Sequence, residues 1–288
     1  METVGKSRIQ TFLSDGWNGK SASNYLVRHG EGYEVRSFPD LVRNVARLSF
    51  YNRDQVLLFR GQNKDHRNRK GNTTIQPKIF RGRYDPALKP WSATLSNRYE
   101  RLARAESLLV DAWSEQKLPE KQRIERHRSL RWAVLQHYEI CATPLLDVSQ
   151  SLRVAASISL RNIAGDEAVL YVLAVPQISG AITASAEAEL QILRLSSICP
   201  PTATRPHFQE GFLLGHYPEL PSANEKQRYA LYEVDFARRL LCKFRLVDLD
   251  RFWRAGFDAV PESALFPNKR DSLVPVANKI KAELPPEI

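Results

Sequence analysis

The chain has 288 residues, a formal net charge of +10 and a pI near 9.6. A chain of this length buries one sizeable core or two small ones, and its basic balance favours anionic partners. No apolar run approaches the ~18 residues that span a bilayer, and residues 1–16 lack the apolar centre of a signal peptide, so we expect neither membrane insertion nor secretion by that route.

Cysteine usage points to a reducing compartment. The three cysteines, Cys141, Cys199 and Cys242, lie far apart in the sequence. This spacing provides neither a disulfide framework nor the close pairs that ligate zinc. We therefore expect a cytoplasmic protein without a bound metal.

The first half of the chain predicts mostly helices. Residues 1–36 mix glycine, serine and charged residues, which predicts an irregular N-terminal lead-in before one domain over residues 37–288. Ser37 is a suitable N-cap for a helix, and the run Gln55 to Phe59 predicts a buried strand. Further helices are predicted over residues 97–116, 124–138 and 150–162.

The second half predicts mostly strands. Apolar runs with β-branched content indicate strands over residues 168–175, 190–198, 212–214, 228–236 and 241–247. Strands that follow one another without long helices between them favour antiparallel pairing. Helices are predicted to close the chain, over residues 249–256 and 272–284. The expected fold class is α+β, with N-terminal helices packed on a mostly antiparallel sheet.

Five short motifs carry the strongest functional signal. In chain order they are Phe59-Arg60-Gly61-Gln62, Ile79-Phe80-Arg81-Gly82, Gln136-His137-Tyr138 with Thr143-Pro144-Leu145-Leu146-Asp147-Val148-Ser149, Gln209-Glu210-Gly211-Phe212 after Arg205, and Leu265-Phe266-Pro267. Their order and spacing resemble the FRG domain family, named for its Phe-Arg-Gly motif. The resemblance covers roughly residues 38 to 282.

A second resemblance, to ADP-ribosyltransferases, implies a ligand. The order of a strand ending in Arg-Gly, a Ser-bearing strand before an Ala-rich helix, and a strand with Gln or Glu is similar to their Arg-Ser-Glu layout. The resemblance implies that Arg60 holds NAD or a similar dinucleotide, that Asp147 and Ser149 shape the pocket, and that Gln209 or Glu210 supports catalysis. If Gln209 faces the pocket from a strand, Glu210 faces away.

This sequence departs from the FRG pattern after His137 and Tyr138. Glu139 stands where the family has glycine, and Pro144 and Val148 replace its usual Arg and Trp. Simpler roles stay open for several candidates. His137 is equally suited to a buried core position, Asp147 to capping the next helix, and Arg205 to a surface ion pair.

The residue chemistry favours a phosphate-and-sugar ligand. Guanidinium groups bind phosphate bidentately, while amides, hydroxyls and carboxylates bind sugar hydroxyls. The predicted binding residues are Arg60, Gly61, Gln62, Asp147, Ser149 and Arg205, and the predicted catalytic residues are His137, Gln209 and Glu210. Whether the chain is an enzyme stays open.

A non-catalytic binding module is the alternative function. The run Lys64-Asp65-His66-Arg67-Asn68-Arg69-Lys70 follows the first motif directly and is strongly basic. Such a run is either a solvated loop or a patch that binds nucleic acid or a protein partner. Aromatic residues that would stack on bases are missing from the run itself.

Overall fold

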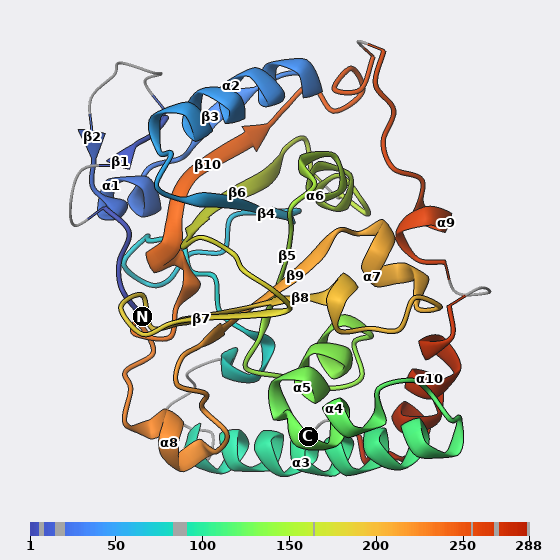
Figure 1. Cartoon of the computed structure of the whole chain (residues 1–288). Coiled ribbons are helices and arrows are strands. Elements are labelled where there is room, and N and C mark those ends of the chain that lie inside the picture. Colours follow the sequence, from blue (N-terminus) through green and yellow to red (C-terminus); the bar gives the residue numbers. More distant parts are fainter. Residues whose placement is uncertain are drawn as a thin grey trace. The chain divides into compact units, whose positions relative to one another are not determined.

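The structure is a computed structural model that describes residues 1–5, 9–14, 21–82, 91–163, 165–254, 256–267 and 271–286. The predicted lead-in thus falls in part outside the described residues, at 6–8 and 15–20. The chain divides into two compact units, each built from three separate segments. Figure 1 shows the helices and strands coloured along the chain. Unit 1 comprises Met1–Ile75, Val148–Ser179 and Asp235–Leu265, and unit 2 comprises Gln76–Asp147, Gly180–Val234 and Phe266–Ile288.

Unit 1 is built on a mixed sheet. Its strands lie in the order β3-β10-β6-β4, and the end of β5 pairs beside β4. Every one of these pairs is antiparallel except β10 with β3, which is parallel. The strands are β3 (Tyr33–Val35), β4 (Val56–Gln62), β5 (Leu146–Ser149), β6 (Ala168–Val175) and β10 (Leu240–Leu246), with a short separate ladder of β1 (Ile9–Gln10) and β2 (Ser21–Ala22).

Within the described residues of unit 1, four α-helices and one 3-10 helix accompany this sheet. They are α1 (Asn24–His29), α2 (Phe38–Tyr51), α6 (Leu152–Ser159), η3 (Phe236–Arg239) and α9 (Glu262–Leu265). Helix α2 begins where the sequence predicts, because the Ser37 hydroxyl accepts a hydrogen bond from the backbone N–H of Asp40. Much of the predicted lead-in is ordered structure, since it contains α1 and the paired strand β3.

Glycine at position 61 allows α6 to pack directly on β4. A Cβ atom placed on Gly61 would lie 2.1 Å from the carbonyl oxygen of Ala155 and 2.7 Å from the backbone nitrogen of Ser159. Both neighbours are backbone atoms of α6 or its last turn, which cannot rotate away. The Gly of the first motif therefore permits a close contact between a helix and a strand.

Unit 2 combines a three-stranded antiparallel sheet with a helical layer. The strand order is β9-β8-β7. Its elements are η1 (Lys78–Phe80), α3 (Trp91–Glu115), α4 (Lys121–Arg126), α5 (Arg128–His137), β7 (Ile182–Ser185), β8 (Leu190–Arg194), η2 (Leu195–Ser197), α7 (Thr204–Phe208), β9 (Gly211–His216), α8 (Ala223–Gln227) and α10 (Leu273–Glu283). The long helix α3 packs against α4, α5, α8 and α10. Trp113 of α3 and Trp132 of α5 are among the most deeply buried core residues of unit 2.

Three predicted elements differ from the structure. Residues 124–138 form two helices, α4 and α5, which meet at His127 in an extended conformation. The predicted strand over residues 228–236 is a series of turns between α8 and η3, and residues 249–254 form turns instead of a helix. The helical prediction for residues 124–138 is thus correct apart from the break at His127. The other two predictions are wrong because short apolar runs do not distinguish strand, helix and buried turn.

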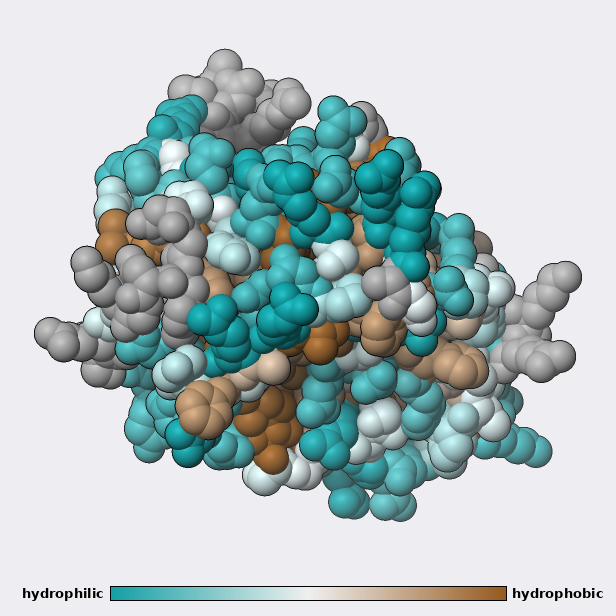
Figure 2. Space-filling model, turned by 90° about the horizontal axis from the view of Figure 1, so that it is seen from above, coloured by the Kyte–Doolittle hydropathy of each residue, from teal (hydrophilic) through white to brown (hydrophobic). Residues whose placement is uncertain are grey.

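The predicted α+β class and the largely antiparallel pairing are confirmed. Among the described residues, no helix combines the length and apolarity needed to cross a membrane. Hydrophilic residues dominate the face shown in Figure 2, where apolar residues reach the surface in separate places.

Candidate functional site

The two halves of the third motif meet at the carboxylate of Asp147 in unit 2. The Asp147 Oδ2 atom accepts a hydrogen bond of 2.6 Å from the Gln136 amide. The Gln136 carbonyl oxygen in turn accepts one of 2.6 Å from the hydroxyl of Thr143, which is fully buried. The Asp147 side chain is 38% exposed. A fixed carboxylate with an open side can accept further hydrogen bonds from a ligand.

His137 lies beside this carboxylate at the end of α5. Its Nδ1 atom is 3.6 Å from Asp147 Oδ1, and its side chain is only 3% exposed. The Nε2 atom is buried and has no hydrogen-bond partner among the described residues. A Cβ atom at Gly211 would lie 3.5 Å from the His137 Cε1 atom, so the glycine of the fourth motif borders the same ring.

Burial lowers the pKa of His137, and the Arg205 charge acts in the same direction, whereas Asp147 opposes the shift. The folded protein therefore keeps this imidazole neutral at pH values where an unfolded chain already binds a proton. A neutral imidazole carries a free lone pair, which makes it a proton acceptor.

This shift predicts a loss of stability at acidic pH. As pH falls below about 6.5, the unfolded chain protonates His137 before the folded chain does, so the free energy of unfolding decreases. The expected contribution has a slope of at most about 1.4 kcal/mol per pH unit. Denaturant unfolding between pH 7.5 and 5 should show a shallower slope for His137→Gln than for the wild type.

His216 is the matched comparison, because burial also lowers its pKa. His216→Gln should flatten the pH dependence separately, and the two changes should add. Identical slopes for the wild type and His137→Gln would contradict the neutral-imidazole assignment.

Arg81, from the second motif, is a cation that interacts electrostatically with the Asp147 carboxylate of this site. The residue as a whole is exposed. Partial burial of the guanidinium lowers its pKa, and the Asp147 carboxylate opposes that shift. Its Nε atom donates a hydrogen bond to the carbonyl of Gln76. The Arg98 guanidinium donates to the backbone carbonyls of Ile79 and Arg81. Arg81 is thus anchored at its base while its guanidinium stays near the surface.

The Arg205 side chain, in α7, forms an ion pair and a cation–π contact with other residues of unit 2. Its Nη2 atom lies 2.9 Å from Glu139 Oε1, and its guanidinium lies over the ring of Phe266 at 4.7 Å. Its backbone N–H donates to Asp271, a buried carboxylate that also accepts from the Tyr138 hydroxyl. Glu139, which replaces the family's glycine, has φ +54 and supplies this ion pair.

Gln209 and Glu210 are not strand residues. Gln209 is buried and ends α7, and Glu210 is exposed with a left-handed φ of +44. Strand β9 begins only at Gly211. The predicted alternation of their side chains across a strand is therefore wrong, because the chain turns at Glu210 before it extends.

Arg60 lies inside a strand, which corrects the predicted strand end. Strand β4 runs through the whole first motif to Gln62, and Arg60 pairs in register with Tyr171 of β6. Tyr171 also pairs in register with Lys243 of β10, so all three side chains share one face of the unit 1 sheet. Burial and the Asp65 carboxylate raise the pKa of Tyr171, whereas the Arg60 charge opposes that shift.

Ser149 belongs to the other face of this sheet. It pairs in register with Phe59, and side chains alternate along a strand, so Ser149 and Arg60 project to opposite faces. The Ser149 hydroxyl accepts a hydrogen bond from the backbone N–H of Ser151, the N-cap of α6. Gln62 donates its amide to the carbonyl of Gly61. A ligand that contacts both Arg60 and Ser149 would therefore have to reach both faces of this sheet.

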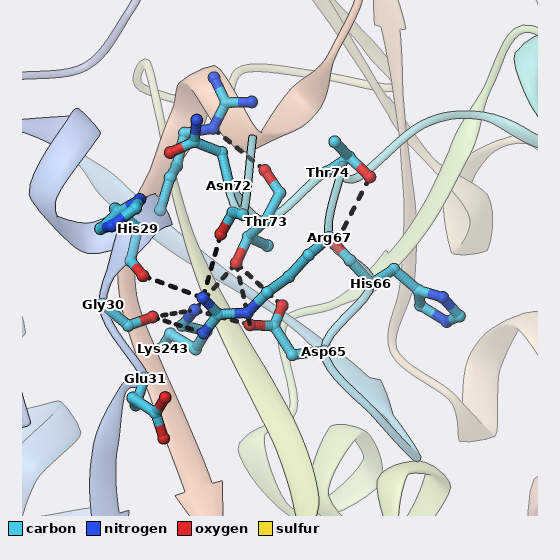
Figure 3. Close-up of polar contacts among 12 residues, drawn as sticks. His29, Gly30, Glu31, Asp65, His66, Arg67, Asn72, Thr73, Thr74 and Lys243 are labelled. Carbon is cyan, nitrogen blue, oxygen red and sulfur yellow. Dashed lines mark hydrogen bonds and ion pairs between the residues drawn. The ribbon is translucent and has the colours of Figure 1, made fainter. Parts of the chain in front are cut away.

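The basic run after β4 is organised around a buried ion pair (Figure 3). Lys243, whose side chain is fully buried, places its Nζ atom 2.7 Å from Asp65 Oδ2. The same carboxylate accepts hydrogen bonds from Arg67 Nε, Tyr171 OH and Thr73 Oγ1. Arg67 also donates to the carbonyls of His29, Gly30 and Gly71. This part of the run is therefore fixed by hydrogen bonds, although its residues 66–70 are exposed to solvent.

Sequence reasoning missed Asp65, Arg81 and Gln136 as individual residues. Arg81 and Gln136 lie within recognised motifs, so the motif itself was an available signal. Asp65 is one acid within a basic run, and its partner Lys243 is 178 positions away along the chain. No local pattern predicts that pairing.

The described residues contain no cluster of three or more His, Cys, Asp or Glu side chains arranged to hold a metal ion. Comparison with protein families finds one match: residues 55–167 match the FRG domain. No curated protein and no solved structure matches the chain.

Proposed function

We propose that the converging motifs form a binding site for a nucleotide-like ligand such as NAD. The match of residues 55–167 to the FRG domain agrees with the motif order that led to this proposal. The site consists of Arg81, Gln136, His137 and Asp147 in unit 2. The observation that supports this proposal is the convergence itself: segments up to 66 residues apart present a cation, an amide, an imidazole and a carboxylate together.

Each group has a role in this proposal. Arg81 is exposed and contacts a phosphate, since a guanidinium binds phosphate with paired, charge-assisted hydrogen bonds. Asp147 accepts hydrogen bonds from sugar hydroxyls on its exposed side. Gln136, locked by Thr143, keeps that carboxylate in place. His137 accepts a proton if the ligand is turned over.

Ligand binding can be measured by calorimetry with NAD, ADP-ribose and AMP as probes. Arg81→Gln is expected to weaken binding roughly 10- to 150-fold, the effect of losing a hydrogen bond to a charged group. Asp147→Asn keeps the shape but removes the charge. It should weaken binding of all three probes, since each contains a ribose, while the variant unfolds at the same denaturant concentration as the wild type.

Glu125→Gln on α4 is the matched control, because it removes an exposed carboxylate elsewhere in unit 2. It should leave the dissociation constants unchanged. If no probe binds, or if binding survives both site variants, the proposal fails. Arg60→Ala, measured beside them, tests the role in ligand binding that the motif order assigns to Arg60.

ADP-ribosyl transfer or NAD cleavage is the finer proposal for the same site. Its measurable sign is nicotinamide release from NAD. Glu210 is the carboxylate that the resemblance implies for stabilising the positive charge that develops on the sugar as nicotinamide leaves. Glu210→Gln should then abolish release while NAD binding persists, whereas equal loss of both would count against a catalytic role.

A further inference from the structure

A pair of stacked aromatic rings is exposed on α1 in unit 1. The rings of Tyr25 and His29 lie 5.6 Å apart between centroids, with an angle of 11° between their planes. Tyr25 is 60% exposed, and the neighbouring Leu26 is 49% exposed. Rings held nearly parallel at a surface offer a flat face on which an unpaired base can stack.

The basic run lies directly against this pair. Arg67 donates from Nη1 to the carbonyl of His29 at 2.9 Å and from Nη2 to that of Gly30 at 2.8 Å (Figure 3). A Cβ atom at Gly71 would lie 3.7 Å from the His29 Cε1 atom. The aromatic residues that the basic run itself lacks are therefore supplied by α1, about forty residues earlier in the sequence.

The run is also held in one conformation. Asn68 closes a tight turn: its backbone N–H donates to the carbonyl of Asn72, and its side-chain oxygen accepts from the N–H groups of Lys70 and Asn72. The negative charge of Asp65 is offset internally by Lys243 and Arg67. Lys64, Arg69 and Lys70 remain exposed, so the outward charge of the run is positive.

We propose that Tyr25, His29 and the exposed cations Lys64, Arg69 and Lys70 form a surface that binds single-stranded nucleic acid. The lysines bind backbone phosphates, and Tyr25 stacks on a base. A ring at an open surface reaches only unpaired bases, so a single strand is favoured over a duplex. The fixed loop lowers the ordering cost of binding. This surface lies wholly in unit 1 and does not depend on the nucleotide site proposed above.

Fluorescence anisotropy with a labelled oligothymidylate of about 12 nucleotides tests this surface. Affinity should fall steeply with salt. Tyr25→Ala should weaken binding roughly 5- to 150-fold, the loss of one stacked base. The plot of log K against log salt should become shallower by about 1.4 in the double variant Lys64→Gln, Lys70→Gln. Each lost phosphate contact on a single strand removes about 0.7 from the steepness of that plot. Arg67 is left intact because it holds the loop.

Helix α2 provides matched controls. Tyr51→Ala removes a tyrosine of similar exposure, 52%. The α2 pair, Arg43→Gln in the helix with Arg53→Gln two residues past its end, removes the same charge from exposed positions. Both should bind the oligonucleotide as the wild type does, and all variants should share its unfolding midpoint. The proposal is overturned if the α2 pair weakens binding as much as the loop pair, if Tyr25→Ala has no effect, or if a duplex binds equally well.

Discussion

Gly61→Ala is expected to destabilise the protein by about 3 kcal/mol, near the upper end of the range for overpacking. The new Cβ atom would lie 2.1 Å from the Ala155 carbonyl oxygen and 2.8 Å from the Ser159 Cβ atom. Relief requires α6 to move off β4, since backbone atoms cannot change rotamer. Thermal unfolding monitored by far-UV circular dichroism should show a fall in melting temperature of roughly 5–10 °C.

Gly165→Ala is the control within the same unit. A Cβ atom at Gly165 meets no described atom within 4 Å, and its backbone does not have a positive φ. This substitution should change stability by less than about 1 kcal/mol, and a small gain is expected because alanine restricts the unfolded chain. Similar melting temperatures for the two variants would show that the packing of α6 on β4 is looser than described.

Asp65→Ala should cost about 3–5 kcal/mol, because it leaves a fully buried ammonium without its counter-charge. Lys243 would keep the Gly30 carbonyl and the Thr73 hydroxyl as acceptors but lose its carboxylate. Lys243→Met should cost less, since Asp65 would retain Arg67, Tyr171 and Thr73. Chemical denaturation of the two single variants and the double variant gives the coupling energy between the two side chains.

An exposed ion pair provides the contrast. Lys121 and Glu125 lie 3.3 Å apart on α4 with both side chains at least 40% exposed. Glu125→Ala should change stability by less than about 1 kcal/mol. If Asp65→Ala has an equally small effect, water must reach Lys243, and the basic run would not be the rigid structure described above.

The elements that the sequence predicts well are those with local causes. Ser37 caps α2 through its own hydroxyl, and the apolar run of β6 is buried at every position, as a central strand requires. The errors arise where distant residues decide the outcome. Strand β4 continues through Arg60 and Gly61 because β6 offers partners up to Val169, and nothing within the motif indicates those partners.

The candidate site divides in the same way. His137 and Asp147 were identified from motif order, and the structure places them 3.6 Å apart within unit 2. Their approach follows from a short excursion of the chain between α5 and β5, so it was within reach of sequence reasoning. The sequence could not predict that Arg60 and Ser149 project to opposite faces of the sheet. Their orientation depends on the register of Phe59 with Ser149, which no local pattern indicates.

The interleaved segments of the two units limit how this protein can be dissected. An excised fragment covering only the family match, residues 55–167, would lack β10 and with it Lys243, and it would retain none of β6. Asp65 would keep only Arg67 and Thr73 of its partners, and β4 would expose a long unpaired edge prone to aggregation. The boundaries of the family match are therefore not those of an autonomous folding unit, and limited proteolysis within either unit should release few stable pieces.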